Sequence, residues 1–145
     1  MTSAVVSGIA AVGTLFANPS GKMFVITSIL IFAIADNIAD TFGMHMYQDA
    51  ELLKGKQVWL STAFNYGARF ITSLVFIAIL FIFPPFLASV ICIAVGLLLL
   101  TIISYAIARQ KKADPILMII EHVGLAIGVL ILSTIAGNII RSQLR

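Results

Sequence analysis

The chain has 145 residues, of which 61% are hydrophobic and only 10% carry a charge, and its mean hydropathy is +1.11. A soluble globular domain has a charged fraction of about 25%, so this composition excludes one and indicates an integral membrane protein. The net charge of +3 comes without a basic stripe or interleaved aromatic and basic residues, which argues against a nucleic-acid partner.

Five apolar stretches follow one another along the chain. Because about 20 apolar residues span about 30 Å of hydrocarbon as a helix, four of them are long enough to cross a bilayer. The first is shorter and lacks the basic start and cleavage pattern of a signal peptide. We therefore expect an all-α integral membrane protein, one transmembrane domain over residues 1–145, with helices at 4–17, 22–48, 58–83, 86–109 and 115–140.

Basic residues outside these helices predict the orientation. Five on one side outnumber three on the other, and cytoplasmic loops carry the excess of Lys and Arg. The larger group is Lys54, Lys56, Arg109, Lys111 and Lys112, and the smaller is Lys22, Arg141 and Arg145. The N-terminus is expected in the cytoplasm, and the plasma (inner) membrane of a prokaryote is the expected location.

The second predicted helix carries two aspartates, Asp36 and Asp40, four residues apart. A charged side chain at the centre of a bilayer costs about 3 kcal/mol on insertion scales, so both count as functional candidates. At about 100° per residue, Met44, Tyr47 and Glu51 share their face. Oxygen ligands with one thioether suit Fe²⁺ or Mn²⁺. The predicted metal ligands are Asp36, Asp40, Met44 and Glu51.

Neighbouring polar residues are candidates for further metal contacts or for a proton relay, because desolvated carboxylates four residues apart can exchange protons. Glu121 belongs to the last predicted helix and is expected on the same inner side as Asp40. The residues of this second group are Asn37, His45, Tyr47, Asp49 and Glu121.

A structural role explains the same charges. The hairpin formed by the second and third predicted helices brings Asp36 level with Arg69 and Asp40 level with Asn65. An intramembrane arginine needs a counter-ion, so an Asp36–Arg69 ion pair is expected, with Asn65 as a further partner. By this count of residues from the hairpin loop, no cation is expected at the depth of Asp40.

Other motifs are few. Gly124 and Gly128 form a GxxxG pattern, which allows close helix approach. Cys92 is the only cysteine, so neither a disulfide nor a cysteine zinc cluster is expected. The absence of a phosphate loop, a nucleophile elbow and an HExxH motif argues against an enzyme.

Several stretches resemble the vacuolar iron transporter family. They are ADNIAD followed by GMHMYQDAE, then TAFNYGARFITSLVFIAILFIFPPF, and finally VGLAIGVLILSTIAGNIIRSQL, in family order and spacing. The resemblance implies five helices per protomer, a homodimer, and export of Fe²⁺ or Mn²⁺ from the cytoplasm against protons, along a path near the dimer axis.

This chain departs from the family pattern at three places. Its first helix has no acid beside Ser7-Gly8, Asp40 stands where the family has a methionine, and Met44 stands where a glutamate often follows the glycine. The long metal-collecting insert is also missing, which makes this a short member.

Two alternatives to metal export stay open. One is a membrane assembly protein that uses the Asp36–Arg69 pair and the glycines only for packing. The other is a proton-coupled exporter of small organic cations, which an aromatic cage of Phe32, Tyr66 and Phe70 beside Asp36 would favour. Under the metal-export hypothesis, the ion is the substrate and no cofactor is tightly bound. The partners are then the bilayer and a second copy of the chain.

Overall fold

The structure, a computed structural model, describes residues 2–51 and 55–143, and of Arg141 only the backbone. Every regular element in these ranges is a helix. They are α1 (Thr2–Ala17), the 3₁₀ turn η1 (Pro19–Gly21), α2 (Lys22–Ile31), the π-helical turn η2 (Phe32–Asp36), α3 (Asn37–Ala50), α4 (Gly55–Ile82), α5 (Pro85–Lys111) and α6 (Pro115–Gln143). Lys54 and Arg145, used in the charge bias, lie outside the described residues.

Four segments are long and apolar enough to cross a membrane: 19–50, which joins η1, α2, η2 and α3, and then α4, α5 and α6. The 16 residues of α1 measure about 24 Å, less than the hydrocarbon thickness of about 30 Å. The protein is therefore an all-α, multi-pass membrane protein with five helical segments. Their ends lie within three residues of those expected from hydropathy.

Proline and aspartate define the turns between the later helices. Pro84 is extended, with φ −62° and ψ 155°, and Pro85 takes the first position of α5, where a missing N–H costs nothing. Lys112, at φ 54°, ends α5 in the left-handed conformation. The Asp114 carboxylate accepts the Ile116 N–H at 2.9 Å and so caps α6.

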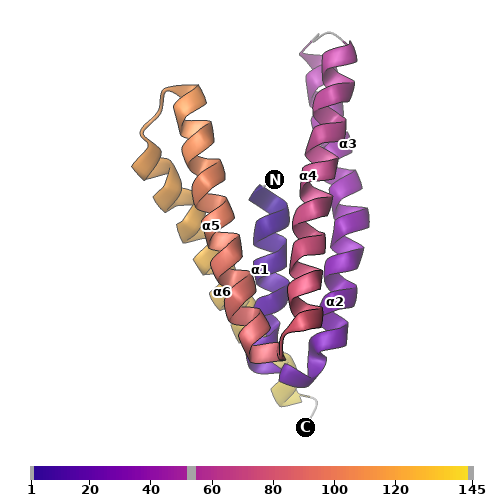
Figure 1. Cartoon of the computed structure of the whole chain (residues 1–145), viewed down its shortest axis with the longest axis vertical. Helices are drawn as coiled ribbons and strands as arrows, with labels where there is room; N and C mark the ends of the chain where they lie inside the picture. The colour runs from indigo at the N-terminus through magenta and orange to yellow at the C-terminus, as the bar shows by residue number, and fades with distance from the viewer. Residues whose placement is uncertain (1, 52–54, 144–145) are drawn as a thin grey trace.

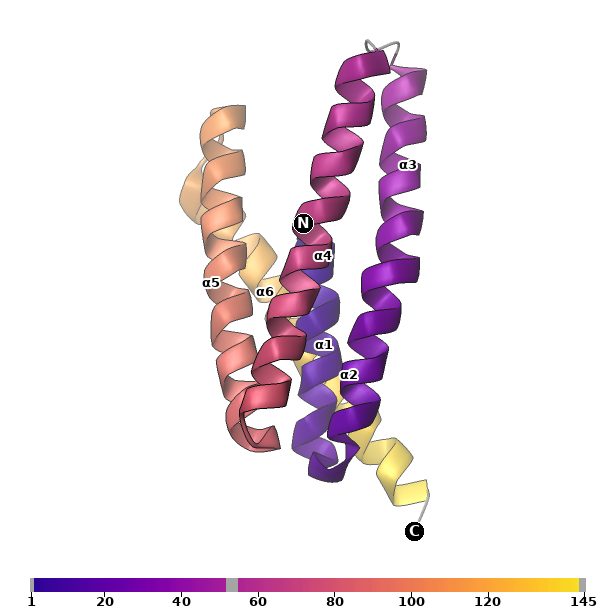
Figure 2. The same ribbon diagram turned by 45° about the vertical axis from the view of Figure 1, so that its right-hand side comes forward.

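The helices form two arms with α1 between them (Figure 1). One arm contains α2, α3 and α4, and the other contains α5 and α6. The arms meet where α2 begins and α4 turns into α5, and they separate toward the opposite end (Figures 1 and 2). At the closed end the Lys22 ammonium donates to the carbonyl of Phe83 at 2.9 Å. Because α1 contacts α2, α4, α5 and α6, it joins the two arms.

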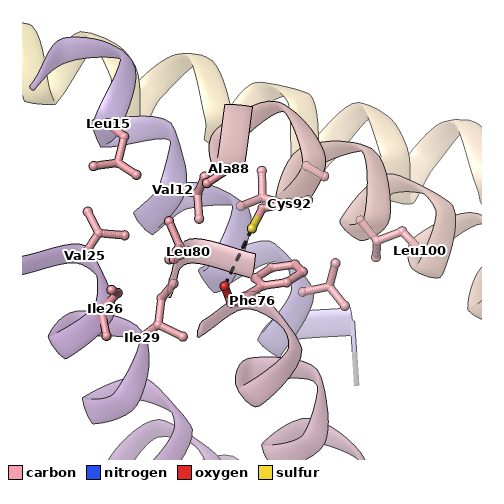
Figure 3. Packing of buried hydrophobic residues seen from close by; sticks show 13 residues of the cluster. Val12, Leu15, Val25, Ile26, Ile29, Phe76, Leu80, Ala88, Cys92 and Leu100 are labelled. Carbon is pink, nitrogen blue, oxygen red and sulfur yellow. Dashed lines mark hydrogen bonds between the residues drawn. The ribbon is translucent and has the colours of Figure 1, made fainter. Parts of the chain in front are cut away.

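The apolar core surrounds Phe76, which is fully buried between α1 and α5 (Figure 3). A Cβ on Gly8 would clash with the Phe76 ring, and one on Gly96 would lie 2.8 Å from Ile9. Cys92 is buried here and its thiol donates to the Phe76 carbonyl at 3.8 Å. Helices in lipid associate through van der Waals packing, so these glycines permit the contact between the arms.

Candidate functional site

A π-helical turn ends at Asp36, inside the long α2–α3 helix. The Asn37 N–H bonds to the carbonyl of Phe32, five residues back. The Asn37 side chain then donates to the Ala33 carbonyl at 2.9 Å, which is the acceptor that its N–H would use in a regular α-helix. π-turns inside α-helices are frequent at functional sites. The local irregularity therefore coincides with the acidic residues selected from the sequence.

Arg69 of α4 holds three side chains from this region. Its Nε donates to Asn37 Oδ1 at 2.6 Å, its Nη1 lies 2.5 Å from Asp40 Oδ2, and its Nη2 lies 3.5 Å from Asp36 Oδ2. The Arg69 side chain is only 4% exposed, whereas those of Asp36 and Asp40 are 44% and 45% exposed. One guanidinium thus faces two half-exposed carboxylates, which leaves one formal negative charge in excess.

The expectation that Asp40 has no cation at its own depth is wrong, because Asp40 is the carboxylate closest to Arg69. Asn65, expected beside Asp40, donates to the Thr41 hydroxyl at 3.4 Å. The long arginine side chain reaches one helical turn along α3, and residues four apart lie on one face of that helix.

α1 and a small cavity complete the surroundings. Ser3 donates to Asp40 Oδ2 at 3.0 Å, which joins the start of α1 to α3. A cavity of about 10 Å³, the size of one water molecule, lies beside Asp36. Its polar lining comes from Ser7, Asp36, Asn37 and Ser73. Among the described side chains, the Arg69 Nη2 is a buried donor without a hydrogen-bond partner.

A ladder of side-chain hydrogen bonds continues between α3 and α4. Beyond Thr41 and Asn65, His45 Nδ1 lies 3.0 Å from the Thr62 hydroxyl, and Ser61 donates to Gln48 at 2.7 Å. The face of α3 that meets α4 is therefore the one bearing Asn37, Thr41, His45 and Gln48.

The structure divides the residues of α3 that were predicted to share one metal-binding face. Asp36 and Asp40 turn toward Arg69, whereas Met44, Tyr47 and Glu51 are exposed and Asp49 lies 3.4 Å from His45. The described residues contain no group of three or more His, Cys, Asp or Glu placed to hold a metal ion. Within residues 2–51 and 55–143, one chain therefore brings together an acidic pair but not a complete coordination shell.

The acidic residue of the last helix is not brought to this site. Glu121 is exposed on α6, whose first half lies in the α5 arm, away from α3 (Figures 1 and 2). Its neighbour His122 accepts or donates a 2.8 Å hydrogen bond with Ser104 of α5. That pair was not foreseen, because adjacency of Ser104 and His122 depends on how α5 and α6 pack.

The aromatic cage considered for organic cations is absent at Asp36 among the described residues. Tyr66 and Phe70 stack on each other, with ring centroids 6.0 Å apart. Only Phe32 of the three candidates lines the cavity beside Asp36, and Tyr66 lines a different groove. The geometry therefore does not favour that alternative.

Comparison of the chain with family models, with curated proteins and with solved structures found no match in any of the three. The geometry of the site is therefore what indicates the function.

Proposed function

We propose that the protein is a cation transporter that exports Fe²⁺ or Mn²⁺ from the cytoplasm in exchange for protons. The observation that carries this proposal is the charge imbalance at Arg69, where two half-exposed carboxylates share one guanidinium inside a membrane-spanning helix. Ionisable residues at such depth generally mark ion or proton pathways. The π turn next to Asp36 adds support, because it occurs where function often requires irregular winding.

In this mechanism a divalent ion binds to the open side of Asp36 and Asp40. The ion competes with Arg69 for Asp40, while the guanidinium keeps its bond to Asn37. Carboxylate oxygens suit both Fe²⁺ and Mn²⁺. Protonation of the two carboxylates from the outer side then weakens these ligands and releases the ion.

A homodimer is part of the proposal, since the described residues of a single chain supply too few ligands in one place. The exposed Met44 and Glu51 extend the acidic face toward the end of α3 and are available to a second copy. In such a dimer, Glu51 and Asp49 meet the ion first, and the two acidic pairs receive it near the axis.

The test is metal flux in proteoliposomes with an imposed pH gradient. Asp40→Asn keeps an oxygen that accepts from Ser3 and Arg69 but removes a charge, so we expect the rate to fall by more than about tenfold. Glu121→Gln is the matched control, because it removes an exposed acid from α6. Transport by a folded Asp40→Asn protein at the wild-type rate would contradict the mechanism through Asp36 and Asp40, and absence of flux in the wild type would contradict the transporter itself.

The second candidate is a membrane assembly protein in which these charges only stabilise the fold. The tight Arg69 contacts to Asn37 and Asp40 favour it, since together they use two sides of the guanidinium. This candidate expects no metal flux and a strong energetic coupling between Asp40 and Arg69.

A further inference from the structure

A groove between α3 and α4 lies outside the acidic pair and has its own polar groups. It has a volume of about 550 Å³. Phe42, Trp59 and Tyr66 provide aromatic walls, and His45 and Asp49 are the ionisable groups of α3 that line it. His45 is mostly covered, at 16% exposure of its side chain, while Asp49 is 56% exposed. The groove therefore gives an ion access to an imidazole and a carboxylate.

The hydrogen bonds of Thr62 are compatible with a proton on His45 Nδ1. The Thr62 hydroxyl has one proton and donates it to the Val58 carbonyl at 2.8 Å. With that proton on Val58, the Thr62 oxygen, 3.0 Å from His45 Nδ1, accepts from an N–H at that nitrogen. In the neutral imidazole this leaves the lone pair on Nε2.

That lone pair faces an acceptor. His45 Nε2 lies 3.4 Å from Asp49 Oδ2, one helical turn along α3. A proton on Nε2 joins the two atoms in an ion pair, and a metal ion can take the place of that proton. A metal at the usual bond lengths of about 2.0–2.2 Å would join both atoms at an angle of about 110°, close to tetrahedral.

We propose that His45 Nε2 and Asp49 Oδ2 chelate a divalent transition-metal ion, with Thr62 as the outer partner that orients the imidazole. Imidazole and carboxylate are common ligands for such ions, and a ligating histidine usually bonds through its other nitrogen to a fixed partner. Water completes the coordination shell from the open groove. The role of His45 and Asp49 as a capture site for the exported ion rests on the proposed function, whereas their binding of a metal ion does not.

The chain contains a single tryptophan, which makes the site measurable. The Trp59 ring centroid lies 4.7 Å from that of His45, so a bound open-shell ion should quench its fluorescence. We expect Co²⁺ added to the purified full chain in detergent to quench Trp59 saturably. His45→Gln should abolish the saturable phase, and Asp49→Asn should weaken the apparent affinity by more than about tenfold.

Matched variants separate ligation from loss of structure. His122→Gln changes the other histidine, which bonds to Ser104 in the α5 arm, and should leave the Co²⁺ titration unchanged. Thr62→Val should weaken Co²⁺ binding by about 10–100-fold, and Thr62→Ser should restore it. If the wild type shows no saturable quenching, or if folded His45→Gln is quenched like the wild type, His45 and Asp49 form only an ion pair and the site is wrong.

A further variant distinguishes this site from the transport pathway. Asp40→Asn should keep the Trp59 response to Co²⁺, because Asp40 contacts Arg69 and Ser3 rather than the groove. Normal quenching without metal flux in the wild type would leave the chelate standing and overturn the proposed transport function, whereas unchanged flux in Asp40→Asn would overturn only the role of the acidic pair. Loss of quenching in Asp40→Asn would overturn the separation of the two sites.

Discussion

Arg69 determines the local structure of the acidic region at the residue scale. Its planar guanidinium presents several N–H groups in fixed directions, so it contacts Asn37, Asp40 and Asp36 at once. A lysine could not reproduce this geometry with one compact ammonium. The contacts hold α4 against α3 and also leave the carboxylates partly open. A structural and a transport role are therefore compatible in the same residues.

A double-mutant cycle measures the structural part of that role. Arg69→Met should destabilise the protein by less than the about 3–5 kcal/mol typical of a broken buried pair, because both carboxylates are half exposed. Adding Asp40→Asn should recover part of the loss, since it removes one unpaired charge. The measurement is unfolding in mixed micelles, with the exposed Arg109→Met as control. Strictly additive effects would show that Asp40 and Arg69 are not coupled.

The level of Arg69 and its ion pair with Asp36 were predicted from the sequence and are confirmed, but its contacts with Asn37 and Asp40 were not predicted. Counting residues from the hairpin loop placed Arg69 opposite Asp36, and the structure places Asn37, one residue further, against its Nε. Counting gives depth because each helical residue rises by about 1.5 Å. It does not give the face of α3 that meets α4, so the hydrogen bonds of Thr41, His45 and Gln48 were not foreseen.

Glycines illustrate the difference between a motif and a contact at the scale of helices. The GxxxG pattern of Gly124 and Gly128 has open space at both positions, whereas Gly8 and Gly96 face Phe76 and Ile9 without forming such a pattern. The spacing of glycines within one helix does not say which neighbour the helix meets. Close approach in this protein occurs where α1 passes between the arms.

A matched pair of substitutions tests this packing. Gly8→Ala should destabilise the protein by about 1–3 kcal/mol, because its Cβ meets the buried Phe76 ring. Gly124→Ala should be neutral or slightly stabilising, since it has space and alanine favours a helix. Thermal unfolding in one detergent compares the two. Equal midpoints would mean that Phe76 does not occupy the position described.

The whole molecule combines a closed end with two separate arms. Hydropathy predicted the four long segments, because a bilayer requires about 20 apolar residues for each crossing, and it marked α1 as a shorter apolar helix. Neither the arrangement of the arms nor the central place of α1 follows from that requirement. Those features depend on tertiary contacts such as Phe76 with Gly8 and the Lys22 bond to Phe83.

Hydrogen exchange should reveal this division. Amides of Met46–Ala50 are expected to exchange before those of Phe76–Leu80, because the first range is mostly exposed and the second includes the core. Mass spectrometry of the detergent-solubilised protein measures both ranges in one sample. Equal protection of Met46–Ala50 would contradict this expectation and would point to a second copy covering the end of α3.

The π turn links the register of the core to that of the acidic pair. If the segment Phe32–Asp36 kept all its residues but wound as a uniform α-helix, the two flanking segments would be rotated by about 100° relative to each other. If Asp40 stayed with Arg69, Val25 and Ile29 would leave the apolar interior; if they stayed, Asp40 would swing away. The π turn thus lets one long helix direct Val25 and Ile29 into the core and Asp40 toward Arg69. A chain of the same length and fold without the turn would lose one of these two sets of contacts.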